Sequence, residues 1–452
     1  MRRRHAIVAI ALAAALAATA CGGGGEERAE PRTIKVAYLK FGTFDANDKL
    51  FKKVKPAFEQ QNPGVTLELI PIEAPIDTEY HTKLSLMQRS ESTAPDVLYE
   101  DSFRISSDAQ AGYLRPLDDY LAKWSEWGQY FDAAKQAGRA QDGKTYGVLM
   151  GTDTRGLWYN QELLRKAGLP LPWQPRSWED VLAAARQVKA RVPGVIPFNI
   201  YSGKPMGEAS SMQGFEMLLY GTGHKLYNPS SNRWVASSPG VTDSFRFIET
   251  VFKEGLAPKP QQALNPNFGT VVATDLLPKG KLAIALDGSW LPQSWLESSQ
   301  KPWPQWSQVL ATTPMPTQNG QAPGSVSMSG GWTLAISAKS RNPDDAWKLI
   351  ELALNQENSR YLDVIASQIA PRKDVAADQE YLKSNPTVKF WTDLVEVTNY
   401  RPAYGAYPRI SNEIAAGMEA VMTGQASPEE AAKNLADSIR SIAGADQVED
   451  AT

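Results

Sequence analysis

The chain has 452 residues, enough for two or three domains, and its 42% hydrophobic and 21% charged residues are normal for a globular protein. The 47 Lys and Arg against 50 Asp and Glu give a net charge of −3 without long runs of one sign, which argues against nucleic acid as a partner. Of the three His, His81 and His224 have no ligand-type spacing, so a zinc site and a Ser-His-Asp triad are poorly supported. Neither a P-loop nor a G-x-S-x-G pattern is present, so nucleotide chemistry and hydrolase chemistry of that type have no motif to support them.

Residues 1–20 have the order of an export signal. Basic residues from Met1 to His5 precede an uncharged, Ala-rich run from Ile7 to Ala18, and small residues stand before Cys21. The apolar run is shorter than the about 20 residues of a transmembrane helix, and no later run of 18 apolar residues predicts a second membrane segment. Residues 21–31 are rich in Gly and are expected to form a flexible tether.

Cys21 is the only cysteine, so it cannot form an internal disulfide. Its place directly after the predicted cleavage site is similar to that of the lipid-modified first residue of bacterial lipoproteins, although that group usually has Leu where this chain has Ala18. The resemblance implies an exported protein, anchored by lipid at Cys21 to the outer face of the cytoplasmic membrane. The alternative is a secreted protein with an incidental Cys.

Strands and helices are predicted to alternate after the tether. Apolar residues recur with a period of two in the predicted strands and of about 3.6 in the predicted helices, and turn signals such as Asn62-Pro63-Gly64 bound these segments. The first elements are a strand over 33–39, a helix over 49–61, a strand over 65–72, a helix over 78–89 and a strand over 96–99. This β-α-β-α-β order predicts an α/β layer with parallel strands.

The rest of the chain continues the alternation. The predicted strands cover 146–150, 157–159, 282–287 and 332–337, and the predicted helices cover 178–191, 245–254, 344–355 and 411–443, the last broken at 423–424. Ser177 is the expected N-cap of the helix over 178–191. No linker divides the chain into halves, which favours lobes built from interleaved segments.

A series of motifs runs in order along the chain. They are Pro95-Asp96-Val97 with Asp101, Ala111 to Asp118, Asp142 to Gly147, Asp153 to Asn160, Ser177 to Asp180, Gly280 to Ile284, Asp287 to Trp290, Gly330 to Trp332, Arg401-Pro402 and Thr423-Gly424. The series resembles the extracellular solute-binding proteins of carbohydrate ABC importers, the group that includes maltose-binding protein.

The resemblance implies an α/β, two-lobe fold of the periplasmic-binding-protein type, in which each lobe is a sheet flanked by helices and the ligand lies in a cleft that closes by hinge motion. Three crossings are expected, near 150–151, 311–317 and 372. They divide the chain into an N-terminal lobe of 32–150 and 315–372, a C-terminal lobe of 151–314 and 373–445, and a tail of 446–452. The implied partners are a carbohydrate and the ABC permease with its cytoplasmic ATPase; no cofactor is expected, and the protein is expected to be a monomer.

Aromatic faces are the first candidates for ligand contact, because a sugar presents a flat C–H face. The resemblance implies that Trp290 stacks on a sugar ring, with a core position below a turn as the alternative. Trp332 follows two Gly residues and is predicted either to contact ligand or to pack at the hinge. The residues Trp295, Trp303 and Trp306 fit lobe packing or a lid equally well.

Acids and arginines are the second class of candidates, because buried sugar hydroxyls require hydrogen-bond partners. The resemblance places Asp101 and Asp153 at ligand-binding positions, and Asp101 is alternatively a helix N-cap. Arg104 is expected beside Asp101, and Arg155 is predicted either as a ligand donor or as a partner of Asp153. Asp287 is a ligand contact or a turn residue.

Two loops complete the candidate site. Arg401, Tyr404 and Tyr407 lie in an aromatic loop before a helix, where the resembling family carries an aromatic ligand contact. Phe41, Thr43 and Asp45 follow the first strand and are expected to line the cleft.

The leading function is capture of a di- or short oligosaccharide for a membrane permease, without enzymatic chemistry. A glycerol phosphate or another polyol remains an alternative, with Arg104, Arg155 and Arg401 as possible phosphate partners. A secreted glycosidase using Asp101 and Asp153, and a surface adhesin or scaffold without a closing cleft, are less favoured readings.

Overall fold

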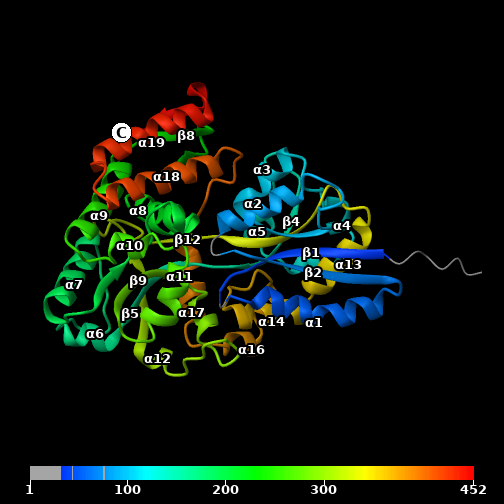
Figure 1. The fold of residues 1–452 in the computed structure, drawn as a ribbon, viewed down its shortest axis with the longest axis horizontal. Helices are drawn as coiled ribbons and strands as arrows, with labels where there is room; N and C mark the ends of the chain where they lie inside the picture. Colours follow the sequence, from blue (N-terminus) through cyan, green and yellow to red (C-terminus); the bar gives the residue numbers. More distant parts are fainter. Residues whose placement is uncertain (1–31, 43, 75–76, 452) are drawn as a thin grey trace, which may run out of the picture.

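The computed structural model describes residues 32–42, 44–74 and 77–451, so Thr43 and the whole predicted signal and tether, including Cys21, lie outside the described residues. Two principal sheets form two lobes, which lie side by side in Figure 1. This confirms the predicted two-lobe α/β architecture. Within the described ranges, no helix is both long and apolar enough to cross a membrane.

The first sheet has the order β2–β1–β3–β13–β4. Its strands are β1 (Arg32–Lys40), β2 (Val65–Glu73), β3 (Val97–Asp101), β4 (Gly147–Thr152) and β13 (Gly331–Ile336). β1 is parallel to β2 and β3, as the β-α-β-α-β pattern predicts, whereas β13 is antiparallel to both β3 and β4.

Helices cover both faces of the first sheet, which Figure 1 shows with α2 and α3 above it and α1 and α14 below. They are α1 (Ala46–Gln61), α2 (Asp77–Met87), α3 (Ile105–Gln110), α4 (Asp118–Leu121), α5 (Asp132–Ala137), α13 (Pro343–Ala353) and α14 (Gln356–Ala366). Apolar faces of α1 and α13 build one core with Val36 and Leu334, while α2 adds Tyr80 and Leu84 to a second core on Ala37. The alternation of Val36 and Ala37 between two cores follows from the period of two in a strand.

The second sheet has the order β10–β5–β9–β6. Its strands are β5 (Arg155–Asn160), β6 (Ile196–Asn199), β9 (Leu282–Gly288) and β10 (Leu310–Thr313). β9 is buried along its whole length, because both faces of this sheet are covered. Leu157 and Tyr159 of β5 contribute to one core, and Trp158 between them contributes to the other.

Helices and two small sheets complete the second lobe and the region between the lobes. The helices are α6 (Gln161–Lys166), α7 (Trp178–Arg191), α8 (Met217–Gly221), α9 (Pro239–Lys253), α10 (Pro260–Ala263), α11 (Phe268–Val271), α12 (Trp306–Val309), α15 (Lys373–Ala376), α16 (Gln379–Leu382), α17 (Val388–Asp393), α18 (Tyr407–Met422) and α19 (Pro428–Ala443), with a π-helix over Ala209–Glu216. The small sheets are β11 (Met315–Pro316), β12 (Ser325–Ser329) and β14 (Thr398–Tyr400), and β7 (Tyr227–Asn228), β8 (Arg233–Ser237) and β15 (Val448–Asp450). Ser177 caps α7 in a capping box with Asp180, as predicted for this N-terminus.

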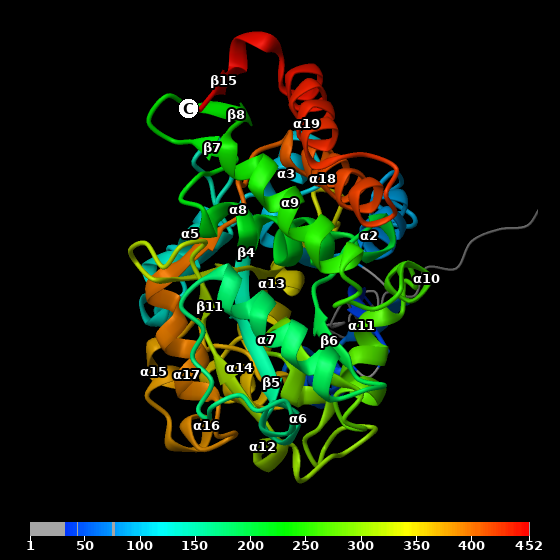
Figure 2. The same cartoon turned by 90° about the vertical axis from the view of Figure 1, so that its left-hand side faces the viewer.

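Short connections lead the chain from the first sheet into the second sheet and from the small sheet of β12 back into the first sheet. β4 of the first sheet leads into β5 of the second, and β12 leads through Gly330 into β13. Figure 2 shows α5 and α17 towards one side of the molecule and α2 and α11 towards the other.

The tryptophans of the second lobe pack together. Trp158 is fully buried, and its ring centroid lies 5.5 Å from that of Trp295, 5.9 Å from that of Trp306 and 5.3 Å from that of Trp391. Of the two roles that the sequence left open for Trp295 and Trp306, the structure therefore shows lobe packing.

We predict that Trp158→Ala lowers the free energy of unfolding by about 3–5 kcal/mol, because it leaves a large cavity among three rings that cannot collapse onto it. Trp303→Ala, at the partly buried margin of the same cluster, serves as the control and is expected to have a much smaller effect. Denaturant titration measures both, and equal destabilisation by the two variants would contradict this account.

Candidate functional site

Two adjoining cavities lie between the lobes, where β1, β3, β4 and β9 end. The first has a volume of about 230 Å³ and the second about 190 Å³, and they share Leu39, Phe41, Phe44 and Trp290 in their walls. Residues of the first sheet and residues of the second sheet line them together. The carboxyl ends of strands are where α/β folds bind ligands, so these cavities form the candidate binding cleft.

Trp290 stands between the two cavities and lines both. Its six-membered ring lies directly against Gly288, where an added Cβ would overlap the ring. The guanidinium carbon of Arg155 lies 4.7 Å from its ring centroid, a cation–π distance. Glycine at 288 and arginine at 155 therefore fix the orientation of an indole that is partly buried.

Trp332 reaches the first cavity, but other rings are stacked on it. Its ring centroid lies 4.4 Å from that of Tyr99 and 5.4 Å from that of His81, with interplanar angles of 1° and 4°. Much of its face is already in contact with protein, which favours the hinge-packing role over a free stacking surface.

Asp153 and Arg155 line the first cavity and are bound to each other. Asp153 also accepts a hydrogen bond from the amide of Gly330 at 3.0 Å, and Arg155 donates to the carbonyl of Met328 at 3.1 Å. The pair thus joins the β4–β5 crossing to the β12–β13 crossing. Arg155 is a partner of Asp153, the second of the two roles predicted for it.

Asp287 lies at the second cavity with Tyr201 and Gln213. Its carboxylate accepts hydrogen bonds from the Gly288 amide at 2.8 Å and the Tyr201 hydroxyl at 2.9 Å. Burial raises the pKa of Asp287 to about 6, and these hydrogen bonds oppose the rise only in part.

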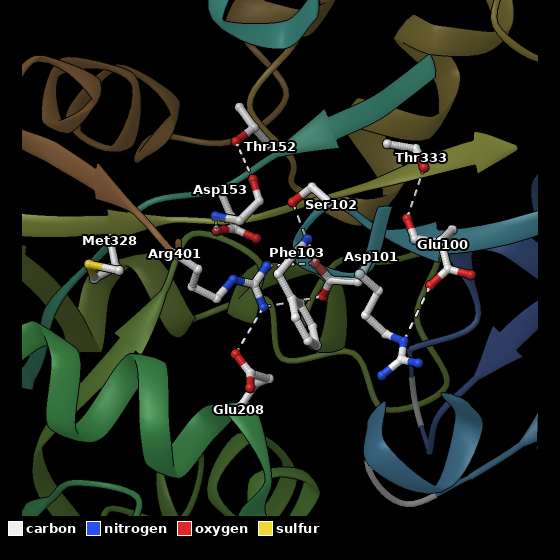
Figure 3. A network of polar contacts seen from close by, with 12 residues as sticks. Glu100, Asp101, Ser102, Phe103, Thr152, Asp153, Glu208, Met328, Thr333 and Arg401 are labelled. Carbon is white, nitrogen blue, oxygen red and sulfur yellow. Dashed lines mark hydrogen bonds and ion pairs between the residues drawn. The ribbon is translucent and has the colours of Figure 1, made fainter. Parts of the chain in front are cut away.

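Asp101, Arg401 and Glu208 form a buried ion network, drawn in Figure 3. The guanidinium of Arg401 donates to Asp101 at 2.6 Å and 3.4 Å and to Glu208 at 3.1 Å. Asp101 also accepts from the amide of Phe103 at 3.3 Å, so it is the helix cap that the sequence allowed. Burial raises the pKa of Asp101, although Arg401 acts in the opposite direction.

Arg104 and Tyr407 belong to the surroundings of this network. Arg104 is 3.1 Å from Asp108 and lines a separate polar cavity of about 320 Å³ with His81 and Glu208. The Tyr407 hydroxyl donates to Glu216 at 2.6 Å, and its own ring is fully buried.

The remaining candidates are spread more widely. Phe41 lines both cleft cavities and stacks on Phe44, with 5.3 Å between ring centroids. Asp45 pairs with Lys49 at 2.8 Å and is not among the residues that line the cleft. Tyr404 packs on Tyr227, 4.1 Å between centroids, inside the second lobe and away from the cavities.

Sequence reasoning did not single out several residues of the cleft. They are Asn47, Tyr99, Gln293 and Gln368 in the first cavity and Tyr201 and Gln213 in the second. Tyr99 precedes the end of β3 by two residues, a position that the strand period could have revealed. Gln213 lies in a π-helix, and the pattern of apolar residues in the sequence does not predict this kind of helix. Within residues 32–42, 44–74 and 77–451, no group of three or more His, Cys, Asp and Glu could hold a metal ion.

We predict that Asp287→Asn stabilises the protein above pH 6. A raised folded-state pKa means that the protonated acid favours folding, and this contribution is lost as the pH rises from 3.8 through about 6. This rise of the pKa from 3.8 to about 6 corresponds to about 3 kcal/mol of lost stability. The amide that replaces the carboxylate does not ionise, and it can still accept from the Gly288 amide and donate to the Tyr201 oxygen. Melting temperatures of both proteins between pH 4 and 8 should diverge with rising pH; parallel curves would contradict the prediction.

Known proteins resemble this chain over most of its length. The galactooligosaccharide-binding protein of Bacillus subtilis is 23% identical over 352 residues, 77% of each chain. The GacH receptor of Streptomyces glaucescens, known unliganded and in complex with acarbose, has a TM-score of 0.76 at 23% identity and covers 91% of this chain and 98% of its own. Maltose-bound MalE3 of T. maritima has a TM-score of 0.75 at 21% identity, with 90% and 99% covered. At these identities the two structures show the fold.

The family assignment rests on the sequence itself. The profile of the bacterial extracellular solute-binding proteins matches residues 43–359, more than half of the chain and a range that holds most of the cleft. The cleft between two lobes, the strand crossings beneath it and this match agree, and the chain belongs to the bacterial extracellular solute-binding proteins.

Proposed function

We propose that this protein captures a sugar, a di- or short oligosaccharide, in the cleft between its lobes and delivers it to the permease of an ABC importer. The observation that carries the proposal is the partly buried ring of Trp290, which lines two cavities with hydrogen-bonding side chains in their walls. Together the cavities fall within the range of about 300–1,000 Å³ that is typical of small-molecule sites.

The cleft chemistry supports a sugar. An indole face covers the C–H face of a pyranose, and the amides of Gln213, Gln293 and Gln368 both donate and accept, as hydroxyl groups require. The relatives named for galactooligosaccharide, maltose and acarbose binding support the same class. We propose Trp290, Phe41, Tyr99, Asp287 and the Arg155–Asp153 pair as the walls of the site.

The location and assembly follow the same proposal. Residues 32–150 with 315–372 form one lobe and 151–314 with 373–445 the other, and hinge motion at the crossings closes the cleft. A monomer, lipid-anchored through Cys21 and its tether at 21–31, presents the sugar to a permease with a cytoplasmic ATPase.

The competing ligands and activities have less support. Each arginine that could hold a phosphate is bound to protein carboxylates: Arg155 to Asp153, Arg104 to Asp108, and Arg401 to Asp101 and Glu208. The same contacts occupy Asp101 and Asp153, the carboxylates that a glycosidase would need as acid and nucleophile. A binding role without chemistry agrees best with this arrangement.

A thermal-shift panel tests the proposal. A ligand that binds only the folded protein raises its melting temperature with concentration. We expect a shift from one class of disaccharide among maltose, trehalose, cellobiose, xylobiose and galactosides. A shift from glycerol phosphates alone would transfer the proposal to a phosphate ester, and product formation from the bound sugar would reveal a hydrolase. No shift from any compound would favour a scaffold.

We predict that Trp290→Ala weakens binding of the sugar found in that panel by about 2 kcal/mol, about 30-fold in Kd, because the buried indole face is lost. Trp303→Ala, which removes a tryptophan outside both cleft cavities, is the matched control and should keep the affinity. Isothermal calorimetry measures both; unchanged binding by Trp290→Ala would remove this residue from the site.

A further inference from the structure

The two cleft cavities differ in the chemistry of their walls. The first, of about 230 Å³, has the side-chain amides of Asn47, Gln293 and Gln368 in its wall. The second, of about 190 Å³, has the apolar side chains of Met206 and Leu291 in corresponding places. A ligand that spans both cavities therefore meets unlike surroundings at its two ends.

The first cavity has amide groups that the protein itself does not use. Gln293 and Gln368 are both partly exposed. In the part of the chain that the structure describes, no group forms a hydrogen bond with either side-chain amide. Each amide offers two donors and an acceptor, which suits the hydroxyl groups of a sugar ring.

The polar side chains of the second cavity, by contrast, are bound within the protein. The Tyr201 hydroxyl donates to Asp287 at 2.9 Å, and the Gln213 amide donates to the carbonyl of Leu286 at 3.0 Å. Tyr201, Gln213 and Asp287 are only 5%, 2% and 1% exposed. A ligand hydroxyl placed in this cavity would lose its water partners and find few others, which is unfavourable.

The apolar character of the second cavity does not depend on how far apart the lobes are. Met206 and Leu291 belong to the same hydrophobic core as Trp158 of the second sheet, and Ala209 packs against that core. The first lobe adds only apolar side chains to this cavity, those of Leu39, Phe41 and Phe44.

We propose that the ligand is a glycoside of two unlike units: a sugar ring rich in hydroxyl groups, which occupies the first cavity, and an apolar unit poor in hydroxyl groups, which occupies the second. This inference rests on the proposed function and narrows its substrate class. The sugar ring exchanges water for the amides of Gln293 and Gln368, and the apolar unit is stabilised by burial against Met206 and Leu291. Trp290, which lines both cavities, contacts both units.

Matched pairs of ligands test the inference by isothermal calorimetry. The two members of a pair share the non-reducing ring and its linkage: phenyl α-glucoside and maltose, phenyl β-glucoside and cellobiose, phenyl β-xyloside and xylobiose, phenyl β-galactoside and lactose. In the sugar class that binds, the phenyl glycoside should have a Kd at least about tenfold lower than the disaccharide, because the hydroxyl groups of a second sugar ring find few partners.

The outcomes separate this inference from the function on which it rests. A disaccharide that binds as tightly as its phenyl glycoside, or more tightly, would overturn the inference and leave sugar capture intact. Absence of binding in every pair would contradict both.

Two variants at partly exposed positions locate the two units. Ala209→Ser adds a hydroxyl group to the wall of the second cavity with little change in volume, and should reduce the preference for the phenyl glycoside by about threefold. Gln293→Ala, the matched change in the first cavity, removes an amide that holds the shared sugar ring. It should weaken both members of a pair by the same factor and leave the preference unchanged. A preference that changes in Gln293→Ala but not in Ala209→Ser would overturn the placement of the two units.

Discussion

The carboxylate of Asp153 connects the β4–β5 crossing between the two principal sheets with the β12–β13 connection. It accepts from the Gly330 amide in the β12–β13 connection and from Arg155 at the start of β5. Arg155 in turn lies over the ring of Trp290, so the orientation of the principal aromatic surface in the cleft depends on a hydrogen bond beneath it. A shift of Asp153 would therefore move both the β12–β13 connection and, through Arg155, the indole of Trp290.

Local patterns in the sequence predicted the elements well and the side-chain partnerships poorly. The strands β1, β2, β3 and β9 and the helix α7 agree with their periodicity, because each buries a regular face. The role of Arg155, by contrast, depends on Met328 and Gly330, which are more than 170 residues away and adjacent only after folding. Tyr99 and His81 are stacked on Trp332, and they come from β3 and α2, which lie beside β13 only in the folded chain. Tyr404 has the sequence context of a cleft residue, yet the neighbouring Tyr227 and Trp234 provide an apolar site for it inside the lobe.

The charges at the centre of the molecule are arranged in compensating sets. Arg104, Arg155 and Arg401 are each paired with carboxylates of the protein, so none of the three offers an uncompensated positive charge to an anionic solute. Besides the Asp153–Arg155 pair and Asp287, the polar groups that line the cavities are neutral amides, and aromatic rings form much of the remaining wall. Such a surface discriminates by the shape and hydrogen-bond pattern of a ligand more than by negative charge, which agrees with the proposed sugar ligand.

The position of β13 has a consequence for how the chain acquires its structure. This strand lies in the first sheet between β3 and β4, but it follows β4 in the sequence by the whole second sheet. Until residue 336 is available, β3 and β4 have unpaired edges, and such edges are prone to pair with other chains. The contacts that complete the sheet are also of long sequence separation, which makes their formation slow. The first lobe therefore finishes folding only after most of the second has been made, and a chain interrupted within the second lobe would leave both lobes incomplete.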